Sequence, residues 1–251
     1  MRKKILFILL VMLGSAFART QAQKTRARKI DTVAVSILDK MSAMIGDLSS
    51  CSVTIKSNYD VQSKELGLVK HSDEEQLFLH GPDKLLIRSE GDKGSRDFIY
   101  DGKTLSYYSL DNNHYGQISI PASIMEMIDT VNKLYGIEFS GADFFYPDFV
   151  EDILSEAKEL AYLGLTKVDG KECFHIAGKA GDKTFQFWIS NDAYTLPLKM
   201  VIVYTSKEMS PQYEAEFTGW QVNPTLPDAL FVFSAPPKAK QIKLKPLTAK
   251  K

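Results

Sequence analysis

The four histidines are the first residues to examine for chemistry, because histidine is the commonest metal ligand and a frequent general base. His71, His80, His114 and His175 form no H-x-x-x-H or H-E-x-x-H motif, and neither cysteine belongs to a Cys-x-x-Cys pair. A zinc site needs three or four convergent ligands, which this spacing does not supply. The sequence therefore predicts no metal site and no cofactor.

Nucleophilic catalysis has one candidate, the pair formed by Cys173 and His175. On a strand these two residues face the same side, but the strand rise separates them by about 7 Å. That separation is too large for the short contact that activates a thiol. The chain also lacks the Gly-x-Ser-x-Gly, Ser-x-x-Lys and P-loop motifs. We interpret the pair as core residues and predict that the protein is not an enzyme.

Paired carboxylates, the usual acid–base groups, occur twice. Glu214 and Glu216 alternate with Tyr213 and Phe217, which is typical of the solvated face of a strand. Asp148, the partner of Asp143, is more simply explained as the N-cap of a helix. What remains is apolar and aromatic surface, to which the chain contributes 2 Trp, 11 Tyr and 14 Phe.

The spacing of apolar residues changes along the chain, and it predicts the helices and strands that must position these residues. Apolar residues at three- and four-residue steps predict a helix over residues 30–48, with Gly46 as a stop. Alternating runs then predict about six strands between residues 52 and 120. Asp101-Gly102 between two such runs is a strong hairpin signal.

A helical segment interrupts the strands. Ser123 and Glu126 form a capping box, and Gly136 ends the helix that follows. A second helix is predicted to begin at Asp148, after the aromatic loop 141–147. About five more strands follow over residues 163–220, with a hairpin turn at Asp169-Gly170. The order predicts one α+β domain, a single antiparallel sheet with helices on one side.

Residues 1–22 have the three regions of a cleavable signal peptide: a basic start, an apolar run from Ile5 to Leu13 and small residues near Ala18 and Ala22. Nine apolar residues are too few to cross a bilayer, which takes about 20. The sequence therefore predicts an exported, soluble periplasmic protein without a transmembrane span. Such a compartment would allow Cys51 and Cys173 to pair, and two buried thiols are an equally good interpretation.

The formal net charge of zero, from 31 basic and 31 acidic residues, conceals an uneven distribution. Removal of residues 1–22 leaves 27 basic and 31 acidic side chains, a net charge of −4. Residues 236–251 hold six lysines and no acid, so the body between them is acidic. This balance argues against a nucleic-acid partner. The basic tail could touch an anionic membrane, but we favour a frayed, solvated end.

Several segments resemble a group of predicted periplasmic proteins, which is similar in turn to the outer-membrane lipoprotein carriers and receptors of the LolA/LolB type. They are Gly81–Arg88, Arg96–Tyr108, Tyr135–Ile137, Pro211–Tyr213 and Trp220–Pro237. The resemblance implies an open, curved antiparallel half-barrel with helices packed on its concave side. In the carriers this hollow takes acyl chains, and a strand arginine, matched here by Arg88, helps to hold the lid. A rim charge explains Arg88 equally well.

We expect residues 23–242 to form this half-barrel domain and residues 243–251 to form a flexible basic tail. The preferred function is non-enzymatic binding or carriage of a lipid or acyl chain by a monomer. The alternative is a cell-envelope module that binds a protein and has a packed interior. An apolar hollow of about 300 Å³ or more would favour the first, and a filled interior the second. The predicted ligand-binding residues are Phe78, Leu86, Arg88, Ile99, Tyr107, Phe144, Phe145, Tyr146, Phe187 and Met200.

Overall fold

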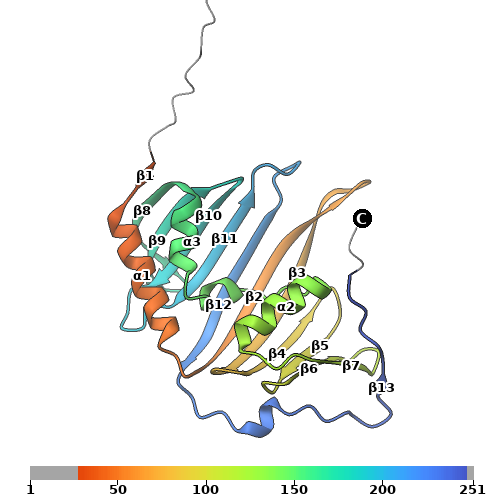
Figure 1. Cartoon of the computed structure of the whole chain (residues 1–251). Helices are drawn as coiled ribbons and strands as arrows, with labels where there is room; N and C mark the ends of the chain where they lie inside the picture. The colour runs from red at the N-terminus through yellow and green to blue at the C-terminus, as the bar shows by residue number, and fades with distance from the viewer. Residues whose placement is uncertain (1–27, 248–251) are drawn as a thin grey trace, which may run out of the picture.

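The computed structural model describes residues 28–247, and the predicted signal peptide, residues 1–22, lies outside them. One 13-stranded sheet runs through the described chain, with three α-helices in front of it (Figure 1). The helices are α1 (Thr32–Gly46), α2 (Ile124–Tyr135) and α3 (Phe149–Glu156), and two short 3₁₀ turns are η1 (Ala142–Phe145) and η2 (Asp228–Phe231).

The strands follow the predicted order, six before the helical segment and five after it, and each end of the described chain adds one short strand. Their bounds are β1 (Lys29–Ile30), β2 (Ser50–Ser63), β3 (Gly67–His80), β4 (Lys84–Gly91), β5 (Arg96–Tyr100), β6 (Thr104–Ser109), β7 (His114–Ser119), β8 (Ala157–Val168), β9 (Lys171–Ala180), β10 (Lys183–Ser190), β11 (Pro197–Tyr204), β12 (Gln212–Val222) and β13 (Lys240–Gln241).

Local signals place the helix and hairpin ends. The Ser123 side chain accepts a hydrogen bond from the Glu126 backbone N–H, the Glu126 carboxylate accepts from the Ser123 N–H, and Gly136 ends α2 in the left-handed conformation. Asp169 and Gly170, between β8 and β9, both have positive φ, as a tight hairpin turn requires. The predicted capping box and this hairpin are therefore confirmed.

The strand order is β1-β8-β9-β10-β11-β12-β2-β3-β4-β5-β6-β7-β13. Every neighbouring pair is antiparallel except the two outermost pairs, in which β1 joins β8 and β13 joins β7 in parallel. The two halves of the chain meet where β12 pairs with β2, for example Tyr213 with Tyr59. The sheet thus has two long meanders, joined at its centre by segments from opposite parts of the chain.

The two faces of the sheet are covered by different parts of the chain. The three helices pack on one face, the helix-bearing face, where they form the main core with residues such as Ile55, Ile87 and Phe187. The opposite face carries a smaller cluster, in which Phe231 of η2 contacts Leu86 and Ile99. Phe231 belongs to residues 223–247, which we call the C-terminal strap; it runs beneath the sheet and up beside β7 (Figure 1).

The cysteines are separate in the fold. Both are buried and free, with Cys51 on β2 and Cys173 on β9. Three strands lie between them, so they are roughly 19 Å apart by strand spacing. A disulfide needs Cα atoms within about 7 Å, so the structure excludes the pairing that the sequence left open. Burial raises the pKa of the Cys51 thiol to about 12.

Candidate functional site

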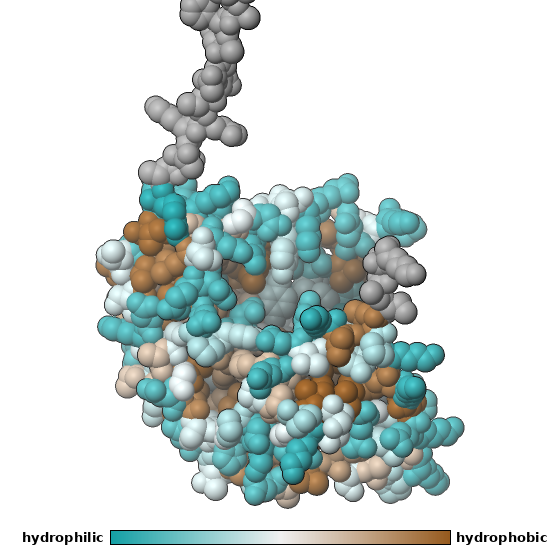
Figure 2. Space-filling view, in the orientation of Figure 1, coloured by the Kyte–Doolittle hydropathy of each residue, from teal (hydrophilic) through white to brown (hydrophobic). Residues whose placement is uncertain are grey.

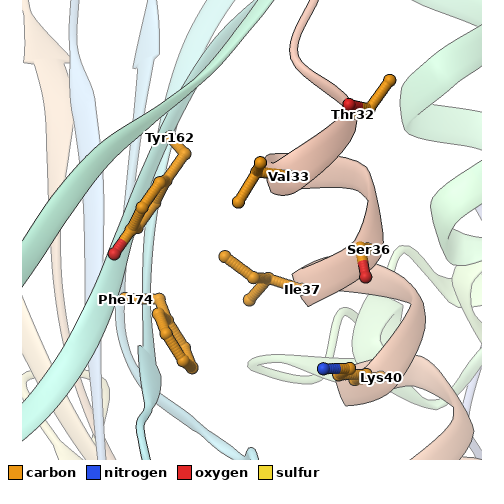
Figure 3. Close-up of a pocket in the computed structure, with 7 residues that line it drawn as sticks. All are labelled: Thr32, Val33, Ser36, Ile37, Lys40, Tyr162 and Phe174. Carbon is orange, nitrogen blue, oxygen red and sulfur yellow. The ribbon is translucent and has the colours of Figure 1, made fainter.

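An apolar groove lies between α1 and the strands β8 and β9. Its volume is about 340 Å³, and its lining residues are Thr32, Val33, Ser36, Ile37, Lys40, Tyr162 and Phe174. Val33 and Ile37 project from α1 toward the rings of Tyr162 and Phe174 across an open space (Figure 3). The polar side chains of Thr32, Ser36 and Lys40 belong to α1 and border the groove. This is an apolar floor with a polar rim, the usual composition of a site for a hydrophobic ligand.

One residue, Asp31, sets the position of α1 over β8. Its carboxylate accepts hydrogen bonds from the backbone N–H of Val33 (2.8 Å) and of Tyr162 (3.2 Å), and its own N–H donates to Leu160 O (3.0 Å). The two accepted hydrogen bonds lower the pKa of Asp31. The same carboxylate therefore caps the helix and ties it to the strand, which holds the two walls of the groove in register.

Apolar side chains are exposed at the mouth of the groove and beside it. Val33 is 51% exposed, and Leu165, the cross-strand partner of Phe174, is 53% exposed. Figure 2 shows hydrophobic side chains gathered over α1 on the same face of the molecule. Exposed apolar residues grouped around a concavity mark a binding site more often than scattered ones do.

The sequence did not predict this groove. Val33 lies off the apolar stripe that predicts α1, Tyr162 directly precedes the strand predicted over residues 163–168, and Phe174 lies in a run that predicts only a strand. The available signal was Val33 itself, an apolar residue next to Thr32 on the side of the helix expected to be solvated. That signal is weak because single exposed apolar residues are common on protein surfaces.

The ten predicted ligand-binding residues do not meet at one site. Tyr107, Phe144, Phe145, Tyr146, Phe187 and Met200 belong to the core of the helix-bearing face or pack beside it. Phe78, Leu86, Arg88 and Ile99 lie on the opposite face, where the strap covers Phe78, Leu86 and Ile99. The two groups are separated by the thickness of the sheet.

Arg88 lies on the side of β4 that faces the strap. It alternates with the inward-facing Ile87 and Ser89, its guanidinium lies 6.0 Å from the centre of the Phe78 ring, and its cross-strand partner is Asp97. Arg88, Phe78 and Asp97 are on the strap side of the sheet, away from the helices. This position favours the rim-charge interpretation over the lid-holding role that the resemblance implied, and that role stays a prediction.

The aromatic residues on the helix-bearing face fill the interior instead of lining a cavity. The Phe144 ring packs against Phe149 (5.0 Å between centroids), Phe217 (5.5 Å) and Phe187 (5.6 Å). Tyr146 is fixed by a hydrogen bond from its hydroxyl to Asp129 Oδ1 (2.7 Å), and burial together with this carboxylate raises the pKa of Tyr146. The apolar groove described above lies apart from this aromatic cluster, at the α1 edge.

A buried polar row crosses the same face above these aromatics. Glu75, Ser89 and Arg96 are successive cross-strand partners on β3, β4 and β5, and Asp73 lies two residues before Glu75. Burial raises the pKa of Glu75, while hydrogen bonding to Ser140 and the nearby Arg96 oppose the rise. The Tyr59 hydroxyl donates to Asp73 Oδ2 (3.2 Å). Figure 2 shows this face hollowed where β11, β12, β2 and β3 extend beyond the helices.

Two further features concern residues 28–247: groups of side chains that could bind a metal ion, and helices that could cross a membrane. In this part of the chain, no group of three or more His, Cys, Asp or Glu side chains is placed to hold a metal ion. None of the helices described there combines the length and apolar composition needed to cross a membrane.

Comparison with known protein families assigns the chain to one family by its sequence. Residues 34–245, most of the chain, match the sequence model of a family described as "Predicted periplasmic protein (DUF2092)". The resemblance noted from the sequence is thereby confirmed. Comparison with curated protein sequences gives no match.

Several solved structures are similar to this chain at low sequence identity. The lipoprotein LppX of Mycobacterium tuberculosis is 15% identical, with a TM-score of 0.46, over 78% of this chain and 98% of that one. LprF of Mycobacterium bovis is 13% identical, with a TM-score of 0.46, over 79% and 98%. A LolA superfamily protein of Nitrosomonas europaea is 11% identical, with a TM-score of 0.34, over 80% and 97%.

Proposed function

We propose that this chain, which belongs to the DUF2092 family of predicted periplasmic proteins, binds a hydrophobic ligand such as an acyl chain without catalysing a reaction. The proposal includes the shape of the fold: an open half-barrel whose helices lie on its concave side. The groove beside α1 is the observation that carries the proposal. Its volume of about 340 Å³ falls at the lower end of the range for small-molecule sites.

The groove suits one apolar segment better than a large ligand. Its floor is formed by Ile37 and Phe174, its mouth by the exposed Val33, and the exposed Leu165 lies beside it as the cross-strand partner of Phe174. An acyl chain laid along it would remove these side chains from water, and burial of each methylene contributes about 0.8 kcal/mol. The rim residues Lys40, Ser36 and Thr32 would meet the polar end of such a ligand.

The first test is whether the protein carries lipid. Protein purified from its native host is extracted and analysed by lipid mass spectrometry, and binding of the dye N-phenyl-1-naphthylamine is titrated. We expect a bound lipid and a dye signal that added fatty acid displaces. Absence of lipid above background together with absence of dye binding would refute the proposal.

Charge substitution then locates the site. Val33→Asp places a carboxylate at the mouth of the groove, and we expect dye affinity to fall at least about tenfold because an acyl chain would have to desolvate it. The substitution is compatible with the fold, since an acid in the first turn suits the helix dipole. Val232→Asp is the matched control, because Val232 is 63% exposed and lies on the strap. Equal loss in both variants would place the site elsewhere.

The alternative function, a protein-binding module of the cell envelope, is favoured by the filled interior around Phe144. Under that interpretation the groove receives an apolar side chain of a partner. A photo-crosslinking amino acid at position 165 distinguishes the two in living cells. A lipid adduct supports ligand binding, and a single protein adduct supports the module.

A further inference from the structure

The β7–β13 edge of the sheet carries four exposed lysines, Lys238, Lys240, Lys243 and Lys245, which we call the basic edge. None of them forms an ion pair with any residue in the range 28–247. Elsewhere, Lys70 pairs with Asp60 (2.7 Å), Lys56 with Glu74 (3.3 Å), and Lys84 with Asp228. The charge of the basic edge is therefore left unneutralised by the fold.

The segments that form this edge contain no acidic residue. Residues 236–247 contain no Asp or Glu, and neither does β7, the strand beside them. Asp111, in the turn that precedes β7, accepts a hydrogen bond from the Ser95 backbone N–H (2.8 Å). The positive field of four lysines in one short segment consequently faces solvent.

The lysines lie on a segment that the sheet holds in place. β13 pairs with His114 and Tyr115 of β7, and the Leu247 N–H donates to the Leu134 carbonyl of α2 (2.7 Å). Leu244 packs directly over Gly116, where a Cβ would stand 2.6 Å from its Cγ. The described part of the predicted tail is thus docked along β7 and reaches α2.

Apolar side chains are interleaved with these charges. Ile242 lies between Lys240 and Lys243, and Leu247, which is 63% exposed, follows Lys245. Leu134, the hydrogen-bonding neighbour of Leu247, is also exposed. Lysines that alternate with exposed aliphatic residues are typical of surfaces that bind at a membrane interface, where the charges meet lipid phosphates and the aliphatic groups enter the headgroup layer.

We propose that the basic edge docks the protein on an anionic phospholipid surface. The charge complementarity is with lipid phosphate, and the interleaved Ile242 and Leu247 fit a lipid interface better than a purely polar partner. The inference concerns the end of the sheet farthest from the α1 groove in strand order, and it holds whether or not that groove binds a ligand.

The test is cosedimentation of the purified protein with vesicles of phosphatidylcholine alone or with added phosphatidylglycerol. We expect binding to the anionic vesicles only, and we expect high salt to abolish it because exposed charges are screened. Lys240→Glu/Lys243→Glu should lower the partition coefficient by at least about 25-fold, since each lysine near an anionic surface contributes about fivefold. Ile242→Ser alone should also weaken binding relative to the wild type, but the dependence of binding on salt should not change.

The matched control is Lys167→Glu/Lys171→Glu, which makes the same change of charge at two exposed lysines on β8 and β9. We expect this variant to bind like the wild type. Equal binding to both vesicle types, or equal loss in both double variants, would overturn the proposal. So would crosslinking from position 243 in cells that captures an acidic protein and no lipid. Unchanged dye binding by the basic-edge variant shows that the groove is intact, which separates this result from the test of ligand binding.

Discussion

The two ends of the sheet are closed in the same way, by a short parallel strand, but they expose side chains of different chemistry. At each end a two-residue strand pairs in parallel with the outermost long strand: β1 with β8, and β13 with β7. At the β8 end, α1 stands over the sheet and leaves an apolar groove with the exposed Val33 at its mouth and the exposed Leu165 beside it. At the β7 end, the strap leaves unpaired lysines.

This difference shows that edge protection and surface chemistry can be separated. An exposed strand edge invites pairing with other chains, so both ends must be blocked. Two residues of parallel strand do this at either end, and the side chains beyond them are free to differ. The apolar end suits the proposed ligand, and the basic end suits the proposed lipid surface.

The largest effect is expected from Phe231→Ala in the strap. Phe231 is buried against Leu86 and Ile99, and removal of such an aromatic side chain costs about 3–5 kcal/mol of unfolding free energy. Urea unfolding measures the loss, and Val232→Ala, an exposed neighbour, should cost less than about 0.5 kcal/mol. A cost for Phe231→Ala as small as that of the control would mean that the strap does not stabilise the β4–β5 part of the sheet.

Gly116→Ala should displace the last part of the strap. The new Cβ would stand 2.6 Å from Leu244 Cγ, and overpacking of this kind typically costs about 1–3 kcal/mol. The double variant Gly116→Ala/Leu244→Ala should recover part of that loss, as a double-mutant cycle by urea unfolding will show. Strictly additive losses would contradict the contact.

Asp31→Ala tests the β8 end. It removes the cap of α1 and the hydrogen bond to Tyr162, so we expect lower stability and weaker dye binding in the groove, whereas Asp31→Asn should retain most of both. Because the pKa of Asp31 is lowered in the fold, its contribution is present above its ordinary pKa of 3.8 and is lost as the pH falls below that value. Thermal unfolding of wild type and Asp31→Ala should therefore converge in acid.

Glu75 lies on β3, between the two ends of the sheet. We expect Glu75→Gln to alter only the dependence of stability on pH. Burial raises the pKa of Glu75 above its ordinary value of 4.5, so the folded state binds its proton more tightly than the unfolded state does. The stabilisation that protonated Glu75 gives the folded state is fully present below pH 4.5, and it is lost as the pH rises through the folded-state pKa. We expect the Gln variant to show a flatter profile in thermal unfolding at rising pH, and an identical profile would contradict the raised pKa.

Much of the fold could be predicted because its signals are local. The Ser123 and Glu126 box, Gly136 and the Asp169-Gly170 turn act within a few residues, and each does in the structure what its sequence indicates. Leu160 shows the limit of such signals. It continued the apolar stripe of α3, but it lies on β8, where β1 pairs with it. Contacts with distant segments decided its conformation.

The candidate site could not be predicted because the sequence does not show which face of the sheet each side chain occupies. Leu85, Leu86 and Ile87 are all apolar, since helices cover one face of β4 and Phe231 covers the other, so no alternation reveals which residues face the helices. A strap that buries part of the second face has no periodic signature of its own. Four of the ten predicted residues therefore lie on the face opposite the other six, and none of the ten lines the groove at α1.

The junction of β12 with β2 at the centre of the sheet has a consequence for folding kinetics. Residues 50–63 form pairs with residues 212–222, so the middle of the sheet is complete only when nearly the whole chain is present. Such non-local pairing raises the contact order and slows folding, because the entropy of closing a long loop must be overcome before the contacts form. The β2–β7 meander, built from neighbouring hairpins, has no such requirement. We therefore expect the amides of that meander to gain hydrogen-exchange protection before those of β12, and the slow closure of the sheet to occur after the chain has been exported.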